Sequence, residues 1–163
     1  MPSSSSALFH GLLSAGAALL SLAMMSCAPL PTTASVAIPP IPTGAARVWF
    51  YRDGGPYDGQ GIPYLRMNEA IVGVSEPQGA LYRDVAPGQY HVTVDSYGRD
   101  FNQSRWVYLF PGQQAYFKIV SLRNWINCGG RRGECQRDTF YVWLMPPETA
   151  RADMAHSAFY GGS

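Results

Sequence analysis

One histidine in the chain stands near a carboxylate at a spacing that invites a catalytic interpretation. His91 and Asp95 fall on the same side of an alternating segment, and a histidine that is hydrogen-bonded to a carboxylate can act as a general base. Four residues of strand span about 13 Å, however, which is far more than the roughly 3 Å of a hydrogen bond. His91 would need another partner, so a periplasmic hydrolase is the least favoured function.

No other residues form a catalytic or metal-binding pattern. The chain contains no nucleophile elbow, H-E-x-x-H segment, P-loop or G-x-G-x-x-G. Asp53 and Asp58 in the loop RDGGPYDGQG could suggest a calcium site, but their spacing differs from that of known calcium loops. The sequence therefore predicts a protein that is not an enzyme, with no catalytic residues, no metal and no cofactor, and a flexible loop at these aspartates.

Two cysteines lie close together near a basic pair. Cys128 and Cys135 flank the segment GGRRGE, and in an oxidising compartment they would form a disulfide that staples a hairpin. Such a short loop gives roughly 2.5 kcal/mol of stabilisation. The spacing is not that of a C-x-x-C redox motif, and no nearby histidine completes a zinc set. Arg131 and Arg132 at the tip could bind phosphate or carboxylate groups, or could simply be solvated.

The remaining cysteine, Cys27, is the first in the chain and follows an uncharged apolar segment. Residues 7–25 read ALFHGLLSAGAALLSLAMM and lead directly into Ser26 and Cys27, a shape typical of an export signal. The segment resembles the bacterial lipoprotein signal, in which the thiol receives diacylglycerol and becomes the new N-terminus. Two alternatives are an uncleaved membrane anchor, which needs about 20 apolar residues, and a buried core helix. The resemblance predicts a signal peptide over residues 1–26 and a lipid on Cys27.

The segment after this cysteine reads as a spacer. Residues 27–45 contain five prolines and no charged side chain, and the first charged residue of the chain is Arg47. Such a composition favours an extended, flexible linker. Ala28 takes the position at which an aspartate signals retention in the inner membrane in lipoproteins of this kind. The expected location is thus the outer membrane, with the domain facing the periplasm and the membrane bound through the lipid.

Residues 46–146 carry the pattern of an antiparallel all-β domain. Short segments alternate between apolar and polar residues and are separated by Gly, Pro, Asn and Asp. Two Pro-Gly pairs, at Pro87 and Pro111, predict type II turns. The first and last strands carry aromatics on both faces, so they are expected either to be central and covered twice or to expose one face for binding. An antiparallel β-sandwich would bury both sets of side chains. The predicted strands are Arg47–Arg52, Pro63–Met67, Ala70–Ser75, Ala80–Val85, Gln89–Ser96, Arg105–Phe110, Gln114–Val120 and Asp138–Met145.

Residues 147–163 are predicted to form a short C-terminal helix and tail. They follow two prolines, and Ala150, Met154 and Ala158 would share one helical face that caps the sandwich.

Aromatic residues are the best indication of binding. Exposed tryptophan and tyrosine side chains stack on sugar rings or anchor protein partners, and core packing is the alternative explanation. The residues in question are Trp49, Tyr51, Trp106, Tyr108, Tyr141 and Trp143. Trp106, Tyr108 and Trp143, with Arg131 and Arg132, are the candidate binding residues.

Three segments carry a family resemblance. ARVWFYR, MNEAIVGVSEPQGALYRDVAPGQYHVTV and PGQQAYFKI are similar to segments of bacterial envelope lipoproteins with a prealbumin-like domain of unknown function. The resemblance covers about residues 45–146 and implies a small sandwich but no functional residues. With a net charge of +1 and 14% charged residues, the composition offers no field that would gather nucleic acid. We expect a lipid-anchored envelope protein with a non-enzymatic interaction or structural domain; the alternative is a glycan- or peptidoglycan-binding module.

Overall fold

The computed structural model describes residues 29–56, 58–96, 101–127, 129 and 133–163. The segment that sequence predicts to be a signal peptide, residues 1–26, and the predicted lipid acceptor Cys27 lie outside these residues. Within the described chain, no helix has the length and apolar character needed to cross a membrane.

The described chain is mostly β-structure, with one short α-helix and two 3₁₀ turns, η2 (Thr33–Ser35) and η3 (Phe101–Gln103). All eight predicted strands are present with shifted ends, and a ninth was not predicted. The strands are β1 (Ala46–Tyr51), β2 (Tyr64–Met67), β3 (Ala70–Val74), β4 (Gly79–Val85), β5 (Gly88–Val94), β6 (Ser104–Leu109), β7 (Gln114–Asn127), β8 (Glu134–Met145) and β9 (Ala158–Gly162).

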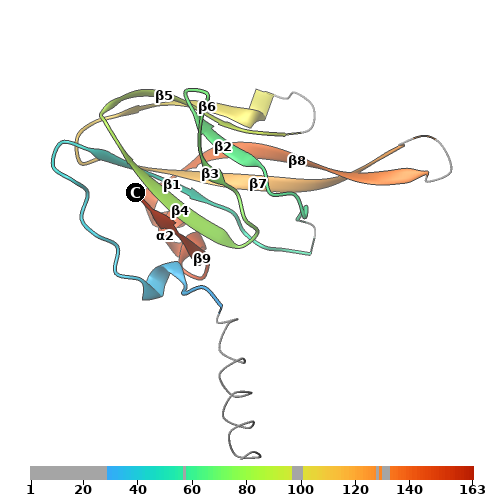
Figure 1. The fold of residues 1–163 in the computed structure, drawn as a ribbon, viewed down its shortest axis with the longest axis horizontal. Helices are drawn as coiled ribbons and strands as arrows, with labels where there is room; N and C mark the ends of the chain where they lie inside the picture. The colour runs from blue at the N-terminus through green and yellow to red at the C-terminus, as the bar shows by residue number, and fades with distance from the viewer. Residues whose placement is uncertain (1–28, 57, 97–100, 128, 130–132) are drawn as a thin grey trace, which may run out of the picture.

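These strands form two sheets that face each other across a common core (Figure 1). The five-stranded sheet has the order β8-β7-β1-β4-β9, and the four-stranded sheet has the order β3-β2-β5-β6. The four-stranded sheet is antiparallel, as predicted. The five-stranded sheet is not, because β1 pairs with β7 and β4 pairs with β9 in parallel.

The core between the sheets is built by the alternation of each strand. Val48 and Phe50 of β1 point into it and are at most 1% exposed, and the Phe50 ring stacks on Phe117 of β7 with centroids 5.8 Å apart. The other side of β1 carries Trp49 and Tyr51, which are also buried. The expectation that this strand is central and covered on both faces is therefore confirmed. The same expectation for the last predicted strand is wrong, because β8 lies at the edge of its sheet and its Trp143 and Leu144 are 47% and 48% exposed.

Two of the tight turns differ although their sequences are alike. Gly112 in the second Pro-Gly pair has φ +75°, the value that a type II turn requires at this position. Gly88 in the first pair has φ +153° and already begins β5, so the prediction of a second type II turn is wrong. The β2–β3 hairpin uses Asn68 and Glu69, both at positive φ, which is the backbone of a two-residue type I′ turn.

The C-terminal segment is only partly helical. Helix α2 (Pro147–Met154) begins with proline at its first turn and buries Ala150 and Met154 against the outer face of the five-stranded sheet. The prediction that Ala158 continues this helical face is wrong: the residue begins β9, which pairs with β4 at the edge of the sheet. The alternation of AFYGG is too short to distinguish a strand from a tail in sequence.

The segment that sequence predicts to be a flexible linker lies against the domain over residues 31–41, which we call the N-terminal strap (Figure 1). The Thr33 N–H donates to the carbonyl of Ser157 at 2.8 Å, and the Phe159 N–H donates to the carbonyl of Pro31 at 2.8 Å. The Arg47 guanidinium donates to the carbonyl of Pro39 at 2.8 Å. Prolines lack an N–H but keep a carbonyl, so a proline-rich segment can still be held by donors from the domain.

Candidate functional site

An exposed row of aromatic rings lies along β6. The strand alternates, so that Leu109 is fully buried while Trp106 and Tyr108 face solvent at 61% and 58% exposure. Phe110 directly follows the strand and is 61% exposed. We call Trp106, Tyr108 and Phe110 the β6 strip. Large apolar side chains that are exposed side by side are typical of an interaction surface.

The rings of this surface are ordered by contacts with their neighbours. Trp106 stacks on His91 of β5, with ring centroids 4.5 Å apart and an interplanar angle of 19°. Tyr108 and Phe110 meet at a tilted angle with centroids 4.9 Å apart. Strand β6 ends its sheet, and the strip lies on the face of that sheet away from the core. A partner would therefore meet a preorganised surface.

The other predicted aromatics divide into two groups. Trp49 and Tyr51 are buried at 4% and 1% exposure, so core packing explains them. Trp143 is 47% exposed, but it lies on β8 of the other sheet, opposite Lys118 of β7. Tyr141 on the same strand is half-buried. Of the candidate binding residues that the structure describes, Trp106 and Tyr108 are brought together and Trp143 lies apart from them.

His91 and Asp95 do not form a catalytic pair. Asp95 is bound by the guanidinium of Arg66 at 2.8 and 3.0 Å, and His91 stacks on Trp106. The carboxylate nearest to the His91 ring is that of Glu69, at 3.7 Å, which is longer than a hydrogen bond. The role of His91 in this structure is to support the aromatic strip.

The glycine-rich loop after β1 is organised around a buried cation. The Arg52 guanidinium donates to the carbonyls of Gly61 and Ser75 at 2.7 and 3.2 Å and also to that of Gly59. Burial lowers the pKa of Arg52. The carboxylate of Asp53 pairs with the Lys118 ammonium at 2.6 Å. Among the described residues, no group of three or more His, Cys, Asp or Glu side chains is placed to hold a metal ion.

Lys118 joins this loop to helix α2. Its ammonium contacts Asp53 at 2.6 Å and Asp153 at 3.0 Å. Burial lowers the pKa of Lys118, but the two carboxylates outweigh that effect and raise it above its ordinary value. Tyr51 donates to the same Asp153 at 3.1 Å, and burial together with this bond raises the pKa of the phenol. All of these groups satisfy one another, which is typical of a structural ion-pair network.

Of the remaining predicted residues, the structure describes Cys135, which lies near the end of the β7–β8 hairpin. Cys135 lies in β8 opposite Ile126 of β7. Cys128, Arg131 and Arg132 lie outside the described residues. The disulfide and the basic tip stay predictions.

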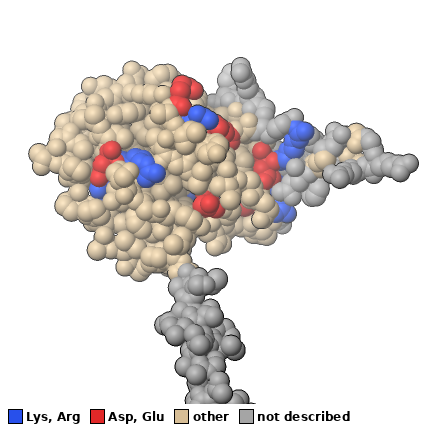
Figure 2. Space-filling model, in the orientation of Figure 1, with Lys and Arg blue, Asp and Glu red and all other residues tan. Residues whose placement is uncertain are grey.

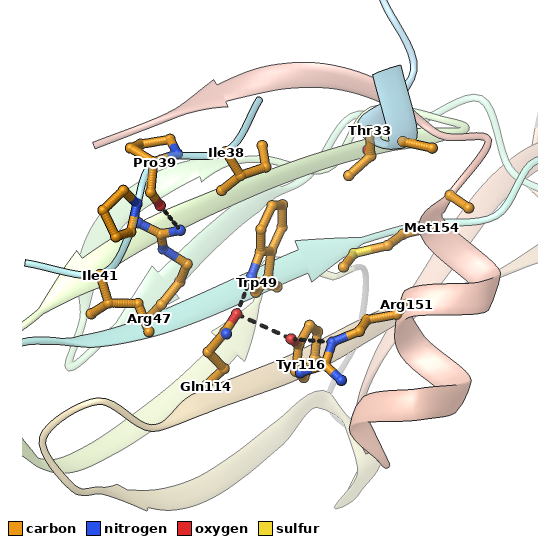
Figure 3. A pocket seen from close by; sticks show the side chains of 13 residues that line it. Thr33, Ile38, Pro39, Ile41, Arg47, Trp49, Gln114, Tyr116, Arg151 and Met154 are labelled. Carbon is orange, nitrogen blue, oxygen red and sulfur yellow. Dashed lines mark hydrogen bonds between the residues drawn. The ribbon is translucent and has the colours of Figure 1, made fainter. Parts of the chain in front are cut away.

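A groove under the N-terminal strap was not predicted from sequence. It has a volume of about 380 Å³, opens to solvent, and is bordered by the strap, the outer face of the five-stranded sheet and α2. We call it the strap groove, and its labelled lining appears in Figure 3. The uncharged, isoleucine-containing segment SVAIPPI was a signal that the strap covers an apolar surface, but nothing in sequence showed which surface.

Hydrogen bonds connect the strands to the helix at one side of this groove. Gln114 Oε1 accepts from Trp49 Nε1 and from the Tyr116 hydroxyl, each at 3.0 Å. The Tyr116 hydroxyl in turn accepts from Arg151 Nε at 3.1 Å, as the dashed lines of Figure 3 show. Arg47, on another side, is bound by Asp84 at 2.7 and 2.8 Å. The groove therefore has fixed polar groups beside apolar walls.

Charge is sparse and mixed on the surface. Figure 2 shows acidic and basic side chains next to one another on the visible face, with wide uncharged areas between them. On this face, recognition would depend on shape, apolar contact and individual polar groups.

No family model, curated protein or solved structure matches this chain.

Proposed function

We propose that the chain is a lipid-anchored cell-envelope protein whose two-sheet domain is a non-enzymatic interaction module, with the β6 strip as its contact surface. The sequence supports the anchor through the apolar segment before Cys27. The two facing sheets are compatible with the β-sandwich and with the prealbumin-like family of envelope lipoproteins that the sequence resembles. The outer membrane, facing the periplasm, is the proposed location.

The observation that carries the interaction role is the exposure of Trp106, Tyr108 and Phe110 in one row, at 58–61% each. An aromatic side chain buries about 150–250 Å² when it enters a contact. Apolar area is worth roughly 25 cal/mol per Å², so covering this row with a partner would be strongly favourable. Aromatic residues of this kind commonly provide most of the binding energy of an interface.

Replacement of the two outward rings of β6 tests this surface. The double variant Trp106→Ser, Tyr108→Ser is expected to lose photo-crosslinks between the strip and its partner in membranes of the native host. The variant should keep its fold, because both side chains face solvent. Trp143→Ser, an equally large change on the other sheet, is the matched control and should leave the crosslinks intact.

Equal crosslinking in all three proteins would contradict the assignment of this surface. The same variants distinguish the second candidate function, a glycan- or peptidoglycan-binding module. That candidate is favoured by the Trp106 ring, which is 61% exposed and can stack on a sugar. If the partner is glycan, soluble peptidoglycan fragments should quench the Trp106 fluorescence, and the double variant should abolish the effect.

The lipid anchor has its own test. In the native host, Cys27→Ser is expected to abolish incorporation of a labelled fatty acid into the protein, since the thiol is the acceptor. The intact mass of the wild-type protein should match a chain that begins at residue 27 and carries acyl groups. Unmodified Cys27 in protein from native membranes would reject the anchor and leave the contact surface untouched.

A further inference from the structure

We propose that the strap groove is a binding site for a small ligand with an apolar body and a carboxylate head, such as an acyl or aryl carboxylate. This inference rests neither on the anchor nor on the β6 strip. The volume of the strap groove, about 380 Å³, lies within the range of roughly 300–1,000 Å³ that is typical of small-molecule sites.

The walls of the groove suit an apolar body. Ile38 and Ile41 of the strap line one side, and Met154 of α2 lines another. Between them lies the ring of Trp49, which is parallel to that of Tyr116 within 3° and has its centroid 6.5 Å away. In Figure 3 the Trp49 ring stands between the strap and Gln114, so a flat or extended apolar group would meet aromatic carbon on one side and aliphatic carbon on the other.

The polar side of the groove offers donors in place of acceptors. Both acceptor bonds of Gln114 Oε1 and the hydroxyl of Tyr116 are already used within the hydrogen-bonded chain. The remaining groups are the Gln114 side-chain NH₂ and the two terminal nitrogens of Arg151, for which the described part of the chain supplies no hydrogen-bond partner. Donors alone, one of them cationic, match an oxyanion.

The positive charge at this side is not neutralised within the described residues. Arg47, the other arginine of the groove, is paired with Asp84 at 2.7 Å, whereas Arg151 makes no ion pair with any described carboxylate. The Arg151 guanidinium is held in place by its bond to Tyr116 and lies 5.5 Å from the centre of that ring. A carboxylate is therefore the head group that complements the groove, and a planar guanidinium binds it in two-point fashion.

The test uses the full chain in lipid nanodiscs and the indole N–H signals of its four tryptophans in NMR spectra. Phenylbutyrate is the probe. Phenylbutanol has the same body with a neutral head, and acetate has the head without the body. Saturable shifts confined to the Trp49 indole are expected with phenylbutyrate, with roughly tenfold weaker binding of phenylbutanol and no shift with acetate.

Arg151→Gln removes the charged contact and also the bond from Arg151 Nε to the Tyr116 hydroxyl, so it should weaken the binding of phenylbutyrate roughly tenfold more than the binding of phenylbutanol. Arg105→Gln, on the four-stranded sheet, is the matched control and should bind as the wild type does. The proposal is overturned if the Trp49 indole does not respond, if the acid and the alcohol bind equally, or if Arg151→Gln has no effect on the acid. These outcomes do not depend on whether the β6 strip binds a partner.

Discussion

Arg52→Met is expected to destabilise the domain by about 3–5 kcal/mol, measured as a lower urea midpoint with an unchanged slope. The guanidinium is 1% exposed and supplies hydrogen bonds to the carbonyls of Gly59, Gly61 and Ser75. Each buried acceptor that is left without a donor costs about 1–3 kcal/mol. Methionine fills a similar length but donates nothing, and removal of the buried charge offsets only part of the loss.

The matched control for this change is Arg123→Met. Arg123 contacts the same loop through the carbonyl of Asp58 at 3.0 Å, but from an exposed position. An exposed substitution of this kind is expected to stay within about 0.5 kcal/mol. Arg52 does not organise the loop if Arg52→Met lowers the free energy of unfolding by less than about 1 kcal/mol, or if Arg52→Met and Arg123→Met lower it equally.

Asp84→Asn is the second change with a large expected effect, also about 3–5 kcal/mol. Asp84 receives two hydrogen bonds from Arg47, at 2.7 and 2.8 Å, and the two side chains are 14% and 3% exposed. Asparagine keeps the shape, but it turns an NH₂ group toward the guanidinium and removes the negative charge. The buried cation then keeps one acceptor on the asparagine, together with the Pro39 carbonyl and the face of Tyr82, but has no negative charge beside it.

The chain contains a second pair with nearly the same geometry in a more exposed place. Arg66 binds Asp95 at 2.8 and 3.0 Å, with side chains 29% and 42% exposed. Asp95→Asn should therefore lower the free energy of unfolding by at most about 1 kcal/mol, because solvent screens this ion pair and can replace its hydrogen bonds. Urea unfolding of both variants measures the difference. If Asp84→Asn and Asp95→Asn lower the free energy of unfolding equally, burial does not determine the strength of the Arg47–Asp84 pair.

The sequence was sufficient to predict which residues are buried in β5 and β1. In β5, Val92 and Val94 alternate with His91 and Thr93, and the structure buries the two valines as the alternation predicts. In β1 the apolar residues occupy both faces, and the strand is central in its sheet. These patterns report burial on each face directly.

Sequence could not separate exposed aromatics from buried ones. Trp49 and Trp106 both lie in strands rich in aromatic residues, yet Trp49 is 4% exposed and Trp106 is 61% exposed. The difference arises because α2 and the strap cover the outer face of the five-stranded sheet, whereas the β6 strip is uncovered. Which sheet receives that cover is decided by contacts between distant parts of the chain, and local patterns do not contain them.

The strap groove was missed for the same reason. Its walls come from the N-terminal strap, from β1 and β7, and from α2. The parallel pairings of β1 with β7 and of β4 with β9 also join segments far apart in sequence. A proline-rich composition favours an extended, flexible segment, and it could not show that carbonyls such as that of Pro31 accept bonds from the domain.

The attachment of the strap shortens the tether that an acylated Cys27 would provide. The first backbone bond to the domain is made by Pro31, and four residues of extended chain reach at most about 14 Å. A lipid-bearing domain attached in this way would stay within that distance of its anchor, whereas a free linker of nineteen residues would let it move through a much larger volume. In Figure 1 the four-stranded sheet lies on the side of the domain opposite the strap. The exposed aromatic rings of this sheet are therefore on the side of the domain away from the tethered segment.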